Sequence, residues 1–257
     1  MTSLHYLDPN PDGYPAVLLL HGLGADSSSW TLQLPALCGA GYRPIAVDTP
    51  GFGASPYDGK GWNMRRVAAE MTGLLCECKI KKADVVGLSM GGIIAQQLAL
   101  DAPDLVRRLV LVSTFAVLRP DTLSGWVYFL QRFVLVNTLG LPAQAKVVAA
   151  RVFPGERYTE LRKMLVDSIA RADPRAYRKA MTSLGLFNSV PRLGAINVPT
   201  LVVTGEDDTT VSPQRQKMLL QGIPEARQVL IPQAGHAVPV DQAETFNREL
   251  LLFLGEK

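Results

Sequence analysis

Residues 84–97, "DVVGLSMGGIIAQQ", decide the fold of this chain. The apolar, β-branched start (84–88) predicts a buried strand, and the stretch from Gly91 predicts a helix. The join between them, 87–91, reads G-x-S-x-G. Its glycines let strand and helix approach closely around Ser89 in a strained turn that exposes the hydroxyl. The helix N-terminus then points at any negative charge that develops there. The alternative is a turn in which the serine only caps the helix.

Strand-like and helix-like stretches alternate along most of the chain. Besides 84–88, short apolar runs that predict buried strands occur at 16–21, 43–48, 109–113, 200–205 and 228–232. Helical patterns follow at 64–78, 91–100, 212–222 and 240–254. This alternation predicts an α/β fold with a mainly parallel central sheet flanked by helices.

The alternation stops between Phe115 and about Pro191, where only helical patterns occur. We therefore predict a core formed by 1–115 and 191–257, with a helical cap inserted at 116–190. The most apolar part of the cap, 126–136, is too short to span a bilayer. We expect it to be buried against the body of the protein, rather than inserted into a membrane surface.

Composition and charge are those of a globular protein without an obvious polyanionic partner. The 257 residues are 47% hydrophobic and 19% charged, with a net charge of +3, which does not indicate nucleic-acid binding. The charge is uneven, because 116–192 holds twelve Lys and Arg but five Asp and Glu. We favour charge complementarity between cap and core as the reason, with attraction of anionic ligands as the alternative.

The N-terminal sequence and the cysteines predict a cytoplasmic protein without stable membrane association. "MTSLHYLDPN" lacks a basic region followed by an apolar stretch. The three cysteines, Cys38, Cys76 and Cys78, are too few and too unevenly placed for a disulfide framework. We interpret them as structural thiols rather than metal ligands or a redox pair.

A nucleophilic serine needs a base, and the chain has three histidines. His5 lies in a polar, proline-containing N-terminal stretch, and His21 ends the first long strand, before Ser89 in the chain. His236 follows the last predicted strand, in "QAGHAVPVD", where a loop brings it to the same sheet edge as Ser89. His236 is therefore the predicted general base, although a helix-capping histidine is the alternative.

The remaining elements are an acid and two donors for an oxyanion. "GEDD" at 205–208 follows a predicted strand, but physics alone does not choose among Glu206, Asp207 and Asp208. The "HGLG" turn at 21–24 exposes backbone, so the N–H groups of Leu23 and Met90 are the predicted oxyanion donors, each worth about 3 kcal/mol. A turn that is glycine-rich only for its geometry is the alternative.

Together, "HGLG", "DTPGFGAS" (48–55), "GLSMGG", "GEDD" and "AGH" resemble the α/β-hydrolase superfamily over nearly the full length of the chain. The resemblance implies Ser89 as nucleophile, His236 as base and then acid, and Asp208, the fourth residue of its turn, as the acid that orients His236. A serine nucleophile separates the chain from the haloalkane dehalogenases and epoxide hydrolases of this fold.

The resulting functional prediction is a serine carboxylesterase that cleaves small to medium esters through an acyl-enzyme, without metal or organic cofactor. We expect a small-molecule ester or lactone as its partner and no nucleic acid, and the oligomeric state stays open. Alternatives are a 3-oxoadipate enol-lactonase, a C–C bond hydrolase, although these typically carry asparagine where this chain has Leu88, and a ligand sensor with vestigial hydrolysis. The candidate pocket residues are Trp126, Phe129, Phe133, Phe187 and Val238.

Overall fold

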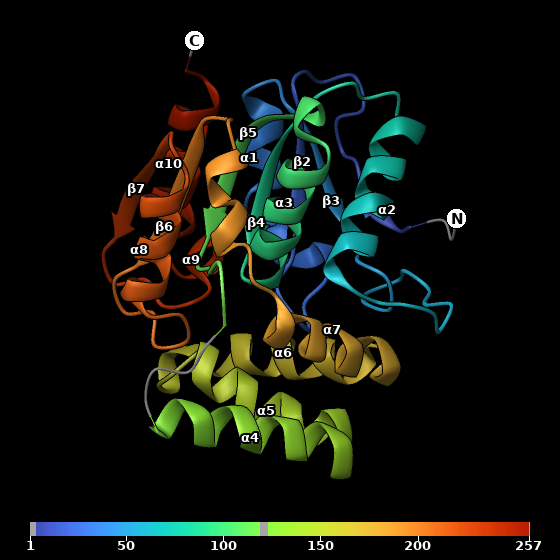
Figure 1. The fold of residues 1–257 in the computed structure, drawn as a ribbon, viewed down its shortest axis with the longest axis vertical. Coiled ribbons are helices and arrows are strands. Elements are labelled where there is room, and N and C mark those ends of the chain that lie inside the picture. The colour runs from blue at the N-terminus through green and yellow to red at the C-terminus, as the bar shows by residue number, and fades with distance from the viewer. Residues whose placement is uncertain (1–3, 119–122, 257) are drawn as a thin grey trace.

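The computed structural model describes residues 4–118 and 123–256. Its sheet has seven strands in the order β1-β3-β2-β4-β5-β6-β7 (Figure 1). All neighbouring strands run parallel except β1, which pairs antiparallel with β3. The strands are β1 (Tyr6–Leu7), β2 (Ala16–Leu20), β3 (Arg43–Val47), β4 (Ala83–Leu88), β5 (Val106–Val112), β6 (Thr200–Gly205) and β7 (Ala226–Ile231).

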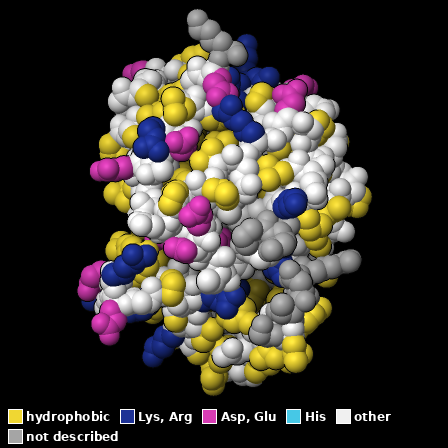
Figure 2. Space-filling model, turned by 90° about the vertical axis from the view of Figure 1, so that its left-hand side faces the viewer, with side chains coloured by type: hydrophobic (Ala, Val, Ile, Leu, Met, Phe, Trp, Pro, Cys, Tyr) yellow, Lys and Arg dark blue, Asp and Glu magenta, His cyan; other side chains and the backbone are white. Residues whose placement is uncertain are grey.

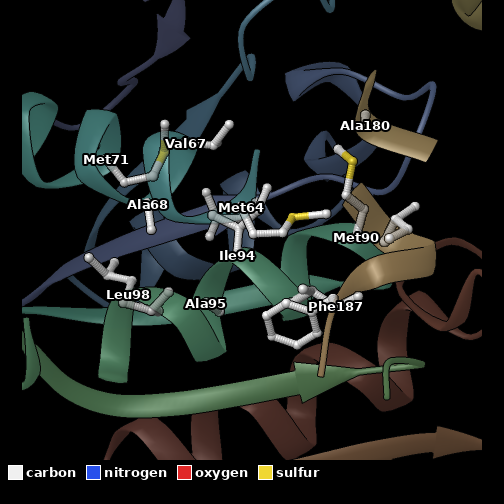
Figure 3. Close-up of a cluster of buried hydrophobic side chains, with 14 of the residues drawn as sticks. Met64, Val67, Ala68, Met71, Met90, Ile94, Ala95, Leu98, Ala180 and Phe187 are labelled. Carbon is white, nitrogen blue, oxygen red and sulfur yellow. The ribbon is translucent and has the colours of Figure 1, made fainter. Parts of the chain in front are cut away.

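Helices cover both faces of this sheet, which explains the continuous apolar strands. On β2, Leu18 and Leu20 face one hydrophobic cluster, while Val17 and Leu19 face the other. The first cluster includes side chains of α2 (Met64–Glu77), α3 (Met90–Asp101) and α8 (Pro213–Gly222), and the second includes those of α1 (Leu34–Gly39), α9 (Val238–Asp241) and α10 (Ala243–Leu254). Figure 3 shows the first cluster, in which α2 and α3 meet through buried methionine, alanine and aliphatic side chains.

The structure confirms the predicted α/β class and differs from the sequence prediction in several details. The apolar run 228–232 was expected to be a buried strand, but β7 is the last strand of the sheet and Leu230 is 52% exposed. Strand β1 was not predicted because it has only two residues. β5 begins at Val106 rather than 109, since two arginines interrupt its apolar pattern, and one of them, Arg107, pairs with buried Asp84. The predicted C-terminal helix is divided into α9 and α10 by Gln242, whose backbone is not helical.

In the part of the chain that the structure describes, four α-helices lie between β5 and β6 at one end of the sheet, namely α4 (Leu123–Thr138), α5 (Gly140–Val152), α6 (Thr159–Arg171) and α7 (Pro174–Leu186) (Figure 1). We refer to them as the cap. The segments that enter and leave the cap contact each other, because the Ser189 N–H donates to Ala116 O at 2.9 Å. The division into core and cap insertion at 116–190 stays a prediction.

The cap packs on core loops through α6 and α7. A Cβ at Gly24 would overlap Ile169 of α6, and one at Gly51 would overlap Ala176 of α7. The Asp173 N–H also donates to Gly51 O at 2.8 Å. Glycine at these two core turns therefore allows the cap helices to make close contact with the core.

The expected burial of 126–136 against the body is wrong for the outer face of α4. Trp126 is 55% exposed and Phe133 is 47% exposed, whereas Val136 is buried. Hydrophobic side chains accordingly appear on the surface at the cap end of the molecule (Figure 2). Within the described ranges, no helix combines the length and apolar content that a bilayer-crossing segment needs.

Candidate active site

Ser89 lies in the tight turn between β4 and α3. Its backbone has φ 53° and ψ −109°, in the left-handed region that L residues rarely adopt. A Cβ at Gly87 would overlap the backbone of Gly91, and a Cβ at Gly91 would overlap the Leu20 carbonyl. The Ser89 N–H donates to Val112 O at 2.9 Å, so β5 also holds the turn. The neighbouring structure thus fixes a strained conformation at this serine.

Asp208 and His236 come together from the loops that follow β6 and β7. His236 Nδ1 lies 3.0 Å from Asp208 Oδ2, and both residues are buried. The two loops touch at the backbone, because a Cβ at Gly205 would overlap the Gly235 carbonyl and the Asp207 N–H donates to Ala234 O. Glu206 and Asp207, the other candidate acids, are exposed.

Asp208 is held as a carboxylate. Burial alone raises the pKa of its carboxyl, but the charge and hydrogen bond of His236 and two backbone donors outweigh burial and hold the pKa below its ordinary value. These donors are the N–H groups of Thr210 and Val211, at 2.7 and 3.0 Å from Oδ1. Asp208 is therefore ionised at neutral pH and can orient and stabilise a protonated His236.

Ser89 and His236 line the same cavity, which has a volume of about 690 Å³ and lies between the core loops and the cap. Leu23, Leu88, Phe115 and loop residues of the core line one part of it. The cap supplies the rest, mostly with apolar side chains, among them Phe129, Val148, Leu165 and Leu184. This arrangement suits a largely apolar organic molecule near the serine.

The two predicted oxyanion donors belong to two different turns, one after β2 and one between β4 and α3. Leu23 lines the cavity, and Met90 is the first residue of α3, with its side chain buried in the core. Among the hydrogen bonds of the described residues, neither the Leu23 N–H nor the Met90 N–H has an acceptor. Both donors therefore remain available to a ligand oxygen, as an oxyanion hole requires.

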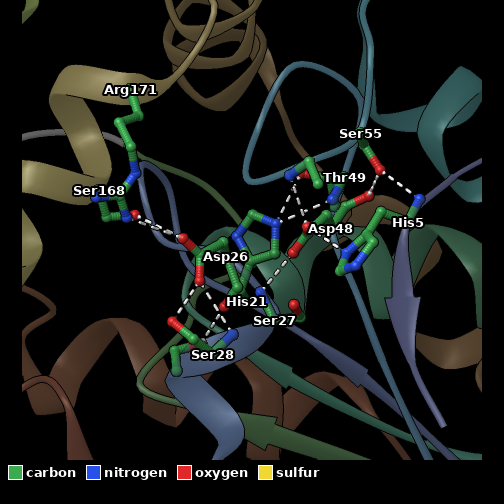
Figure 4. Close-up of polar contacts among 12 residues, drawn as sticks. His5, His21, Asp26, Ser27, Ser28, Asp48, Thr49, Ser55, Ser168 and Arg171 are labelled. Atoms are coloured by element: carbon green, nitrogen blue, oxygen red, sulfur yellow. Dashed lines mark hydrogen bonds and ion pairs between the residues drawn. The ribbon is translucent and has the colours of Figure 1, made fainter.

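His21 connects the Leu23 turn to β3. The Thr49 N–H donates to His21 Nε2 at 3.0 Å, which leaves Nδ1 to donate to Gly22 O at 2.8 Å (Figure 4). Burial lowers the pKa of His21, in agreement with this neutral ring. His21 was not predicted to be a base, and here it fixes the carbonyl that precedes Leu23.

A second set of contacts ties the same loop to β3 and to the cap. Asp48 accepts from the Ser27 N–H at 2.6 Å, and His5 Nδ1 lies 2.8 Å from its other oxygen. On the cap side, Ser168 of α6 donates to Gly24 O at 2.8 Å and lies 3.1 Å from Asp26 (Figure 4). Nothing in the sequence pattern links 24–26 to 168, because such contacts depend on how the cap packs.

Of the five predicted pocket residues, one lines the cavity. Phe129 lines the cavity, but Trp126 and Phe133 face outward from α4, and Phe187 and Val238 are buried in the two hydrophobic clusters. These four do not line this cavity, because an apolar helix does not reveal from sequence which face is covered. The lining residues that the sequence analysis missed include apolar side chains such as Val148 and Leu165 and also several polar ones, namely Asp26, Tyr128, Arg132, Arg151, Ser168 and Arg215.

Metal ligands and paired thiols are not evident in the part of the chain that the structure describes. No cluster of three or more His, Cys, Asp or Glu side chains there is arranged to hold a metal ion. Cys38, Cys76 and Cys78 are free thiols.

The chain is similar in sequence and in fold to known hydrolases. A model of the alpha/beta hydrolase family matches residues 17–249. A protein of Variovorax paradoxus named as the carbamate hydrolase RutD is 33% identical, covering 98% of this chain and 96% of the relative. The crystal structure of the enol-lactonase from Burkholderia xenovorans LB400 has a TM-score of 0.90 and 29% identity, covering 99% of this chain and 97% of that chain. A thermophilic esterase from Thermogutta terrifontis, with malate bound, has a TM-score of 0.86 and 28% identity, covering 98% and 92%. Since the family model spans most of its length and the fold agrees throughout, the chain belongs to the α/β-hydrolase family.

Proposed function

We propose that this protein is a serine hydrolase of carboxylic esters, with Ser89 as nucleophile, His236 as general base and Asp208 as the acid that orients it. The observation that carries the proposal is the convergence of a strained, glycine-flanked serine and a buried His–Asp pair on one cavity. Structural serines and histidines have no reason to share a cavity in this arrangement.

The reaction begins when Ser89 Oγ attacks the ester carbonyl while His236 Nε2 takes its proton. The oxyanion that forms accepts hydrogen bonds from the Leu23 and Met90 N–H groups, and the N-terminus of α3 adds its dipole. His236 then gives the proton to the leaving alcohol. Water, deprotonated by the same imidazole, attacks the acyl-enzyme and releases the acid.

The size and lining of the cavity favour an ester with an acyl chain over the carbamate named for the relative from Variovorax paradoxus. A carbamate ion has few heavy atoms and little apolar surface. A cavity of about 690 Å³ with aromatic and aliphatic walls leaves most of its volume unused by such an ion. An acyl group of small to medium length buries its hydrocarbon surface there.

The proposal predicts that the protein hydrolyses p-nitrophenyl butyrate and that Ser89→Ala lowers kcat by about 10⁴-fold or more. The measurement is release of p-nitrophenol under multiple turnover. Ser183→Ala, on α7 and outside the cavity lining, is the matched control and should keep wild-type turnover. Undiminished turnover by Ser89→Ala would refute the assignment.

A lactone is the second candidate substrate, supported by the likeness to an enol-lactonase over 99% of the chain. Ring opening uses the same attack on a carbonyl and the same acyl-enzyme, with the leaving alcohol still attached. The experiment compares kcat/KM for simple lactones with kcat/KM for esters of equal carbon number. The substrate class with the higher kcat/KM is the preferred one. A single turnover followed by persistent ligand binding, on all substrates, would instead indicate a sensor.

A further inference from the structure

Two arginine side chains of the cap line the cavity that holds Ser89 and His236. They are Arg132 of α4 and Arg151 of α5. Neither forms an ion pair with an acidic group among residues 4–118 and 123–256. Asp26 is the one acidic side chain among the described lining residues, and it is engaged with Ser28, Ser168 and Arg171. Arg132 and Arg151 therefore bring positive charge to the cavity lining that no acidic side chain of the described residues neutralises.

The two guanidinium groups flank one aromatic ring. Arg132 Cζ lies 5.7 Å and Arg151 Cζ lies 4.6 Å from the centroid of Tyr128, which also lines the cavity. Two cations near one ring gain from its electrons but repel each other. An anion bound between them would remove the repulsion.

Neutral groups hold both arginines in place. Arg132 Nη2 lies 3.4 Å from Tyr177 Oη, and the buried Gln144 amide, with its oxygen turned toward Arg132, accepts from Nε at 2.8 Å. Arg151 donates to Thr209 O. These contacts orient the guanidinium groups without neutralising them, so each keeps N–H groups and a full charge for a ligand.

These contacts also connect the arginines to the segments that carry the candidate catalytic groups. The Tyr177 ring packs against Gly24, next to the oxyanion donor Leu23, and Thr209 follows Asp208. A substrate whose carbonyl lies at Ser89 can therefore extend along the apolar wall toward α4 and α5 and reach the arginines with its other end.

We propose that Arg132 and Arg151 bind a carboxylate on the far end of the substrate, so that the preferred substrate is an ester or lactone carrying a second, ionised acid group. This inference rests on the proposed function. The apolar wall suits a hydrocarbon spacer, and guanidinium groups recognise a carboxylate through charge-assisted hydrogen bonds. The excess of twelve Lys and Arg over five Asp and Glu in 116–192 attracts the same anions to the cap.

The test compares two esters that differ only at the far end, p-nitrophenyl hexanoate and the mono-p-nitrophenyl ester of adipic acid. Wild-type kcat/KM should favour the adipate ester by about tenfold or more. Arg132→Gln and Arg151→Gln should each reduce that ratio by about tenfold, and Arg132→Lys should reduce it less. Lys163→Gln, an exposed cap residue outside the cavity, removes the same charge and should leave the ratio unchanged.

Binding to Ser89→Ala separates this inference from the proposed function. Calorimetry with monomethyl adipate and methyl hexanoate measures recognition without turnover, and the adipate ester should bind about tenfold more tightly, with the advantage lost on adding Arg132→Gln. Equal binding of the two esters would overturn the carboxylate site even if the enzyme hydrolyses both. Absence of turnover with preferential binding of the anion would overturn only the ester hydrolase assignment.

Discussion

The core and the cap contribute to the same cavity in different ways. In the core, backbone contacts fix the candidate catalytic groups. The Ser89 N–H donates a hydrogen bond to Val112 O, and the loops that carry Asp208 and His236 make contact at Gly205. In the cap, long side chains such as Arg132 and Arg151 reach the cavity, and half of α4 faces solvent. From this difference we propose that the core determines the reaction and the cap determines which substrate is preferred. Core variants should change turnover of every ester, and cap variants should change preference among esters.

The largest effect is expected from the acid that orients His236. Asp208→Asn should lower kcat by about 10⁴-fold on all esters, because an amide no longer stabilises the imidazolium or the required tautomer. Its neighbour Asp207 is exposed, so Asp207→Asn is the matched control and should stay within about twofold. The measurement is kcat for p-nitrophenyl butyrate at neutral pH. Equal losses in the two variants would remove Asp208 from its proposed role.

The next effect is on stability and tests how tightly the core is packed at Ser89. Gly91→Ala places a methyl group against the Leu20 carbonyl of a central strand and should lower the free energy of unfolding by about 1–3 kcal/mol. Gly39→Ala, at the end of α1 where no atom lies within 4 Å of the added group, should be neutral or raise it by up to about 1 kcal/mol. Urea unfolding measures both. A tolerated Gly91→Ala would mean that the close approach is not required.

Stability should also depend on pH through His21. Because burial lowers its pKa, the folded state keeps the ring neutral while the unfolded chain binds a proton below about pH 6.5. Stability is therefore full above that pH and falls as pH drops toward the folded pKa, by at most about 1.4 kcal/mol per pH unit. Urea unfolding at pH 8 and pH 5.5 measures the fall. His21→Asn should be less stable at pH 8 but show a smaller fall, and an equal fall would contradict the prediction.

The same division between core and cap explains what the sequence could predict. Strands buried on both faces show as continuous apolar runs, so β2 to β6 and the loops that carry Ser89, Asp208 and His236 could be placed. The edge strand β7 was also placed, although most of its residues are not buried. The choice among the three acids of 206–208 came from the family resemblance, because tertiary contacts decide which side chain of a loop points toward the histidine. Cap helices expose one face and cover the cavity with another, and the apolar pattern of α4 does not distinguish them. The position of Arg132 in the cavity could not be predicted either, because it depends on tertiary contacts with Tyr177 and Gln144.

The smallest effect should come from two phenylalanines one turn apart on α4. Phe129 lines the cavity and Phe133 is 47% exposed on the outer face. Phe129→Ala removes apolar surface from the proposed acyl site and should lower kcat/KM for p-nitrophenyl butyrate by about tenfold. Most of this loss should come from a higher KM and less from a lower kcat. Phe133→Ala should alter kcat/KM by less than about twofold and the free energy of unfolding by less than about 0.5 kcal/mol. Because both variants remove the same atoms from the same helix, any difference between them reports contact with the cavity. A larger loss in Phe133→Ala would show that the cap adopts another arrangement during turnover, with the outer face of α4 turned toward the substrate.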